Sequence, residues 1–85
     1  MKAFQIDFSK TAIKHLKKVP SNVQGKIIRA IEQLKVNPFR GKKLQGELDG
    51  LYSLRVWPYR ILYRVSKSEL IIIVIDIGQR QGIYT

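Results

Sequence analysis

The sequence contains no cysteine and only one histidine, His15, among its 85 residues. Without cysteine the chain can form neither a disulfide framework nor a thiolate metal site. A single histidine and six carboxylates supply few ligands for any other metal centre. We therefore expect a protein that holds no metal and no cofactor.

Long hydrophobic runs are also missing. The longest, Leu70 to Ile75, has the length of a buried strand and is far too short to span a bilayer. Met1 to Ser9 lacks the apolar core of a signal peptide. We expect a cytoplasmic protein without membrane association, folded as one small domain over residues 1–85.

Acidic residues are scarce, because six Asp and Glu face sixteen Lys and Arg, for a net charge of +10. Eleven of the basic residues but only two of the acidic ones lie between Met1 and Gly46. Lysines spread along helices are often no more than a solvated face. An excess this one-sided nevertheless favours a polyanionic partner, either nucleic acid or an acidic protein.

The first half of the chain predicts one strand and two helices. Phe4 to Phe8 alternates apolar and polar residues, which is typical of a strand. Ser9 can cap a helix over about 10–19, and Ser21 a second one over about 22–36. Apolar residues recur along one stripe of each segment, so we expect a short αα-hairpin.

The second half predicts three strands after a basic, glycine-containing loop over residues 39–50. The strands cover about 51–56, 59–65 and 70–77, and their short connections require antiparallel pairing. The last strand is apolar on both faces and should be central and covered on each side. The order β-α-α-β-β-β predicts an α+β domain, a small antiparallel-dominated sheet with the αα-hairpin packed on one face.

Alternation along the strands separates the arginines from the apolar residues. The apolar sets belong against the helices, which leaves Arg55, Arg60 and Arg64 together on the opposite, open face. Arg80 and Tyr84 follow the last strand and can fold back beside them. Solvated arginines, or arginines paired with Glu69 or Asp76, are the plainer alternative.

An ordered set of segments resembles the RelE branch of the RelE/ParE toxin superfamily. The matching segments are Lys43 to Gly46, Gly50 to Val56, Tyr59 to Tyr63 and Gly78 to Tyr84. The resemblance covers essentially the whole chain and implies a RelE-like microbial ribonuclease-type fold. It also implies the toxin of a type II toxin–antitoxin system, an endoribonuclease that cuts messenger RNA in the ribosomal A site.

Residue roles follow from the same resemblance. By position, Arg60 matches the central arginine of the family's site, Arg80 its second arginine and Tyr84 its tyrosine base, and Arg55 matches a catalytic or phosphate-binding basic residue. The family pattern is not complete, because Ser53, Gln45 and Gln79 stand where relatives often have basic residues. These departures bear on the rate and codon preference more than on the reaction class.

The proposed chemistry also has an independent argument. Cleavage of RNA by its own 2′-hydroxyl needs a base, cations on the phosphorane and a donor to the leaving oxygen. Guanidinium groups suit the second task, since they bind phosphate in bidentate fashion and stay charged. Tyrosine is a weak base at its ordinary pKa of about 10, but neighbouring arginines favour the phenolate. A site built on two histidines is excluded.

Further residues are expected to bind RNA or the ribosome. Lys42 and Lys43 suit the RNA backbone rather than catalysis, because a glycine-containing loop cannot hold a proton-transfer geometry. Arg64 and Gln79 are assigned the same binding role. Trp57, beside Pro58, either stacks on a base or caps the hairpin, and the sequence leaves both open.

Partners and rival functions complete the expectations. The resemblance implies a cognate antitoxin of the RelB type, acidic and partly disordered, that wraps the basic domain in a hetero-oligomer. A ParE-like inhibitor of DNA gyrase without nuclease activity is one alternative. An inactive basic domain that only binds its antitoxin and nucleic acid is the other.

Overall fold

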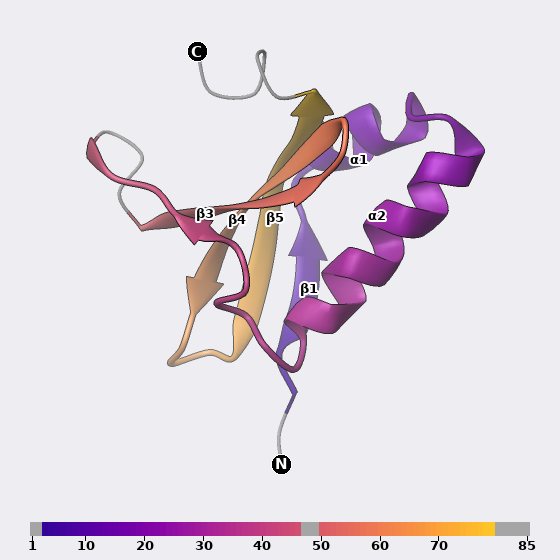
Figure 1. Ribbon diagram of the computed structural model, residues 1–85. Helices are drawn as coiled ribbons and strands as arrows, with labels where there is room; N and C mark the ends of the chain where they lie inside the picture. The colour runs from indigo at the N-terminus through magenta and orange to yellow at the C-terminus, as the bar shows by residue number, and fades with distance from the viewer. Residues whose placement is uncertain (1–2, 47–49, 80–85) are drawn as a thin grey trace.

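Two helices and a mixed sheet form the fold in the computed structural model, which describes residues 3–46 and 50–79 (Figure 1). The expected α+β class is confirmed. The elements are β1 (Gln5–Phe8), α1 (Lys10–Lys17), α2 (Ser21–Leu34), β2 (Lys42–Lys43), β3 (Leu51–Val56), β4 (Tyr59–Ser66) and β5 (Ile71–Gln79). Neither described helix is long and apolar enough to cross a membrane.

The sheet order is β1-β5-β4-β3-β2, so the last described strand is internal and lies between β1 and β4. Short turns join β3, β4 and β5, and these strands pair antiparallel as predicted. β1 pairs parallel with β5. The two helices and the strands β2 to β4 lie between them in the chain and supply the long connection that a parallel pair needs. Figure 1 shows α1 near the carboxyl ends of β1 and β5, and α2 running alongside the sheet.

The main core lies between the helices and one face of the sheet. The α2 stripe contributes Ile27, Ile31 and Leu34, all buried. The sheet contributes Ile72, Val74 and Ile77 of β5 and the alternating residues of β3 and β4 that the sequence assigned to this face, Tyr52, Leu54, Val56, Tyr59, Ile61, Tyr63 and Val65. Burial of these residues orients the sheet, so the intervening residues of β3 and β4 turn to the other face.

The first helix cap is confirmed and the second is not. The Ser9 hydroxyl accepts a hydrogen bond from the Ala12 amide at 3.0 Å and donates one to the Ile75 carbonyl at 2.6 Å. Ser21, predicted as a cap, is instead the first helical residue, and Pro20 precedes it without a side-chain cap. The Pro20 carbonyl accepts bonds from the Val23 and Gln24 amides, both at 2.9 Å.

The open face differs from the sequence prediction in two places. Residues 42 and 43 were expected in a loop but form the short edge strand β2 on β3. The central strand was expected to be covered on both faces, but Ile73 is 36% exposed. A smaller cluster of Leu44, Leu51, Leu62 and Ile75 covers only part of this face, because both helices pack on the other one.

Candidate nucleic-acid interface

Arg55 of β3 and Arg60 of β4 lie directly opposite each other in the β3–β4 hairpin. Opposite residues of an antiparallel pair share a face, with their Cβ atoms about 5 Å apart. Arg60 is in turn paired with Gly78 of β5, which has no side chain to cover the guanidinium. Arg55 is exposed and Arg60 half-buried. The predicted juxtaposition of the two arginines is confirmed.

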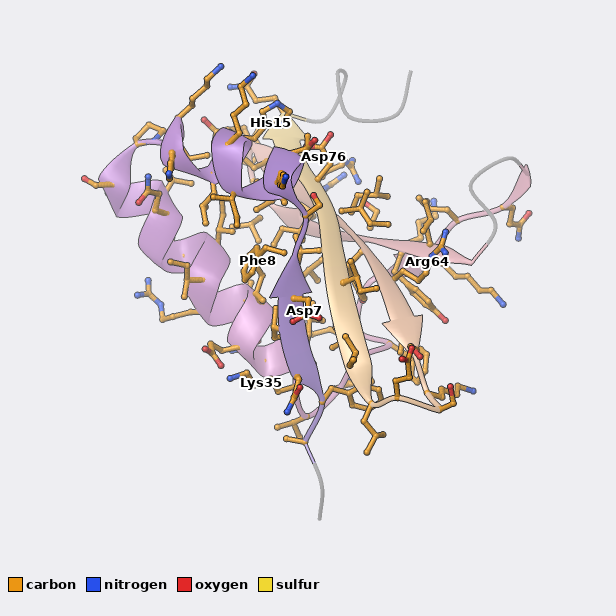
Figure 2. All side chains as sticks on the ribbon, turned by 180° about the vertical axis from the view of Figure 1, so that it is seen from behind. Asp7, Phe8, His15, Lys35, Arg64 and Asp76 are labelled. Atoms are coloured by element: carbon orange, nitrogen blue, oxygen red, sulfur yellow. The ribbon has the colours of Figure 1, made fainter. Side chains whose placement is uncertain are left out.

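The carboxylates that could have neutralised these arginines are engaged elsewhere. Asp76 accepts a hydrogen bond from its own neighbour Ile77 at 2.8 Å and contacts His15 Nδ1 at 2.6 Å. Glu69 accepts a hydrogen bond from Ser66 at 3.1 Å. Figure 2 shows His15 on α1 beside Asp76 near the end of β5. Within residues 3–46 and 50–79, no ion pair joins an arginine to a carboxylate.

Two further basic residues share the arginine face. Arg64 lies four residues after Arg60 on the same strand, is exposed, and projects from the side of the sheet away from α2 (Figure 2). Lys42 pairs with Ser53, which lies two residues before Arg55 on the same face of β3. We call the set Arg55, Arg60, Arg64 and Lys42 the basic face.

The register places two other predicted RNA-binding residues away from the basic face. Lys43 pairs with Tyr52, and Gln79 pairs with Tyr59. Both tyrosines pack against the main core, so Lys43 and Gln79 share the helix side of the sheet. The sequence could not separate Lys42 from Lys43, because the pairing of β2 was not predicted.

Arg80 and Tyr84 lie outside the described residues. The two remaining members of the predicted catalytic set, Arg55 and Arg60, are brought together by the hairpin register. A group of three or more His, Cys, Asp or Glu residues that could hold a metal ion does not occur in the described part of the chain.

A buried tyrosine of β4 holds the segment that leads into β2. The Tyr63 hydroxyl donates a hydrogen bond to the Pro38 carbonyl and accepts one from the Gly41 amide, both at 2.9 Å. Burial raises the pKa of Tyr63 above its ordinary value of 10.0, although the Gly41 hydrogen bond acts in the opposite direction. The hydroxyl thus ties the segment before Lys42 to the centre of the sheet.

The His15–Asp76 contact was also missed. The His15 side chain is 40% exposed, and its Nδ1 atom lies 2.6 Å from Oδ1 of Asp76. The two residues lie 61 positions apart in the chain. A local pattern carries no signal for such a contact, which depends on the packing of α1 against β5.

Comparison with known proteins gives matches over nearly the whole chain. A family model described as the ParE toxin of type II toxin–antitoxin systems matches residues 6–84. A toxin named RelE1 from Methanocaldococcus jannaschii is 35% identical over an alignment of 86 residues. The alignment covers 95% of this chain and 94% of that protein. The mRNA interferase toxin RelE of Escherichia coli is 28% identical over 81 residues, covering 93% and 85% of the two chains.

A solved structure shows the same fold. One chain of the toxin–antitoxin complex RelBE2 from Mycobacterium tuberculosis superposes with a TM-score of 0.84 at 30% sequence identity. The superposition covers 92% of this chain and 99% of that chain. The helices and the strands that position the basic face therefore follow an architecture already seen in an experimental structure.

Proposed function

This chain belongs to the family of ParE toxins of type II toxin–antitoxin systems, and from that premise we propose that it is the toxin component of such a system. Its similarity to toxins named RelE, one of them an mRNA interferase, confirms the expected resemblance and supports endoribonuclease activity. The proposed reaction is cleavage of messenger RNA in the ribosomal A site, which inhibits translation.

The observation that carries this proposal is the opposition of Arg55 and Arg60. Like charges directly opposite each other destabilise a sheet, and among the described residues neither arginine forms an ion pair with a carboxylate. A phosphodiester would relieve this repulsion and accept bidentate hydrogen bonds from both guanidinium groups. The same site therefore favours the pentacoordinate phosphorane, whose oxygens carry more negative charge than the substrate's.

The proposed mechanism needs no metal ion. Tyr84 removes the proton from the 2′-hydroxyl, whose oxygen attacks the adjacent phosphorus and forms a 2′,3′-cyclic phosphate. Arg60 and Arg80 stabilise the phosphorane, and Arg55 binds phosphate or assists the departing 5′-oxygen. The assignment of Arg80 and Tyr84 rests on their positions in the family pattern.

Other basic residues are proposed to hold the RNA or the ribosome. Lys42 and Arg64 extend the basic face from the arginine pair away from the turn between β3 and β4. Lys43 and Gln79 lie on the helix side and would contact RNA backbone that passes around the edge of the sheet. Such contacts neutralise phosphates and give affinity rather than base recognition.

The proposed partner that silences the toxin is a RelB-like antitoxin. The similar chain from M. tuberculosis was solved in a toxin–antitoxin complex. A domain of net charge +10 is suited to an acidic, partly disordered chain that folds as it binds. The active form would be a free cytoplasmic toxin, and the stored form a hetero-oligomer with its antitoxin.

Primer extension on a message translated by purified ribosomes tests the nuclease proposal. We expect new 3′ ends within the A-site codon when the protein is added, and none when ribosomes are omitted. A protein that leaves the translated message intact would contradict the proposal. Cleavage by a Tyr84→Phe variant at the parental rate would overturn the assignment of the base while leaving the nuclease function in place.

A gyrase inhibitor is the second candidate, because the matching family model is that of ParE toxins. Such a protein would use the fold as a protein-binding module. It would abolish supercoiling of relaxed plasmid by purified DNA gyrase and leave translated messages uncut. We expect the opposite pair of results, since a gyrase-binding module gives no reason to place two arginines opposite each other with no counter-ion among the described residues.

A further inference from the structure

Trp57 is the single tryptophan of the chain and lies in the turn between β3 and β4, where it is 68% exposed. We propose that Trp57 is a stacking platform for one nucleobase of the RNA whose phosphate lies on Arg55 and Arg60. The proposal deepens the nuclease function and rests on it.

The exposure of Trp57 argues against a role in holding the hairpin together. The residues on both sides of the turn, Val56 and Tyr59, pack against the main core, whereas Trp57 belongs to neither hydrophobic cluster. Tryptophan is one of the more buried residues on average. An indole that capped the hairpin would lose most of its accessible surface, so the capping alternative does not fit.

Trp57 differs in its surroundings from Phe39, the other exposed aromatic residue in the described part of the chain. Phe39 is 42% exposed, but its ring contacts the ring of Tyr52 at a centroid distance of 5.5 Å. The Nζ atom of Lys67 lies over the Phe39 ring, 5.2 Å from its centroid. In the described part of the chain, Trp57 has no aromatic ring or cation against its indole. Both faces of an exposed indole are the surfaces on which unpaired bases stack.

The distance from Arg55 to Trp57 suits a base that neighbours the phosphate on the arginines. Trp57 follows Arg55 by two residues, and with a strand rise of about 3.3 Å per residue their Cα atoms lie about 7 Å apart. The Arg55–Arg60 pair is separated from the turn by only one pair, Val56 and Tyr59. A single strand with a phosphate on the arginines therefore brings a neighbouring base to the hairpin tip, where stacking tolerates any of the four bases.

The fluorescence of Trp57 provides a direct test, because no other tryptophan contributes to the signal. The probe is a short single-stranded RNA with 2′-O-methyl groups, which removes the attacking hydroxyl and prevents cleavage. We expect saturable quenching of the indole by this RNA. An oligonucleotide of the same charge with abasic positions should bind more weakly and quench little, because phosphate contacts remain and stacking is lost.

Substitutions separate stacking from general hydrophobicity. Trp57→Phe should keep RNA affinity within about threefold, whereas Trp57→Leu should lose roughly tenfold or more, the order of one base–aromatic stack. Val36→Ala is the matched control, since Val36 is 78% exposed beyond the end of α2. Its RNA affinity should equal that of the parent, and thermal unfolding should confirm that all three variants remain folded.

The outcomes distinguish this inference from the nuclease proposal. If the parent cuts ribosome-bound message, but RNA does not quench Trp57 and Trp57→Leu binds RNA and cuts at parental levels, stacking is overturned and the nuclease function stands. If Trp57→Leu weakens only antitoxin binding, the residue is a protein contact and the inference is wrong. A third outcome would refute the nuclease function and support stacking. In that case the parent cuts no message, RNA still quenches Trp57, and Trp57→Leu alone loses RNA affinity.

Discussion

The hydroxyl of Tyr63, at the centre of β4, accepts a hydrogen bond of 2.9 Å from the amide of Gly41, 22 residues earlier. Tyr63 is fully buried, and its hydroxyl also donates to the Pro38 carbonyl. These two bonds fix the segment that leads into β2, and β2 brings Lys42 beside Ser53. A polar contact inside the core thus places part of the basic face on the opposite side of the sheet.

Tyr63→Phe should lower the free energy of unfolding by about 1–3 kcal/mol, since it leaves the Gly41 amide and the Pro38 carbonyl without their buried partner. Tyr52→Phe is the control. Its ring stacks on that of Tyr63 at 5.5 Å, and its hydroxyl makes no hydrogen bond to the described residues. Urea titrations of the two variants should differ clearly, and equal midpoints would contradict the proposed tie.

The stability of the protein should depend on the ionisation of Tyr63 at alkaline pH. Burial raises its pKa above 10.0 in the folded state, so the unfolded chain releases this proton first as the pH rises. The contribution of the neutral Tyr63 side chain to the free energy of unfolding is complete below pH 10 and is lost as the pH passes through the folded-state pKa. The stability difference between the parent and Tyr63→Phe should therefore narrow above pH 10. Parallel urea-derived curves from pH 8 to 11 would contradict this.

Alanine at two glycines should have opposite effects. A Cβ at Gly41 would lie 2.7 Å from the Tyr63 hydroxyl and 2.9 Å from the Ser53 carbonyl, so Gly41→Ala should destabilise by about 1–3 kcal/mol. At Gly25, within α2, the nearest atom is on the Arg29 side chain at 3.5 Å, an ordinary contact. Gly25→Ala should stabilise by about 0.5–1 kcal/mol. Thermal midpoints that move in the same direction would refute the steric argument.

Lys42 and Lys43 provide a matched pair for testing the basic face. Both are exposed neighbours in β2, but only Lys42 shares the face of Arg55. Lys42→Ala should weaken RNA binding more than Lys43→Ala and reduce the slope of log affinity against log salt by about 1. Fluorescence anisotropy of a labelled RNA at several salt concentrations measures both quantities. Equal losses would show that β2 contributes diffuse charge only.

Arg60→Lys should cut ribosome-bound message at least about 100-fold more slowly than the parent, because an ammonium group cannot replace two aligned guanidinium donors on the phosphorane. Arg29→Ala, on the exposed surface of α2, also changes one arginine and is the control. Its rate should stay within about threefold of the parental rate. Single-turnover primer extension gives both rates, and a fully active Arg60→Lys would remove this residue from the mechanism.

The sequence predicted the helix stripe, the hairpin and the shared face of Arg55 and Arg60, and the structure confirms all three. These features depend on periodicity along single elements and on short connections, which are local properties. The cap at Ser9 was predicted for the same reason. The predicted cap at Ser21 is wrong, because α2 begins at Ser21 itself and Pro20 takes the cap position.

The loop predicted over residues 39–50 is wrong at residues 42 and 43 for a different reason. Glycines and lysines there indicate a loop, but the Tyr63 hydroxyl holds the segment and lets residues 42 and 43 pair with β3. The partner lies far away in the sequence, so no local propensity reports it. The opposite faces of Lys42 and Lys43 follow from that pairing alone.

The amino-acid sequence by itself determined the α+β class, the surplus of positive charge and the alternation that sets arginines against apolar residues, because composition and period act within each segment. Only the tertiary structure decided which side chains the carboxylates contact. Packing of α1 against β5 engages Asp76 with His15, and the hairpin register sets Arg55 against Arg60. Electrostatic pairing depends on distance in space, and among the described residues it leaves that arginine pair without a counter-ion.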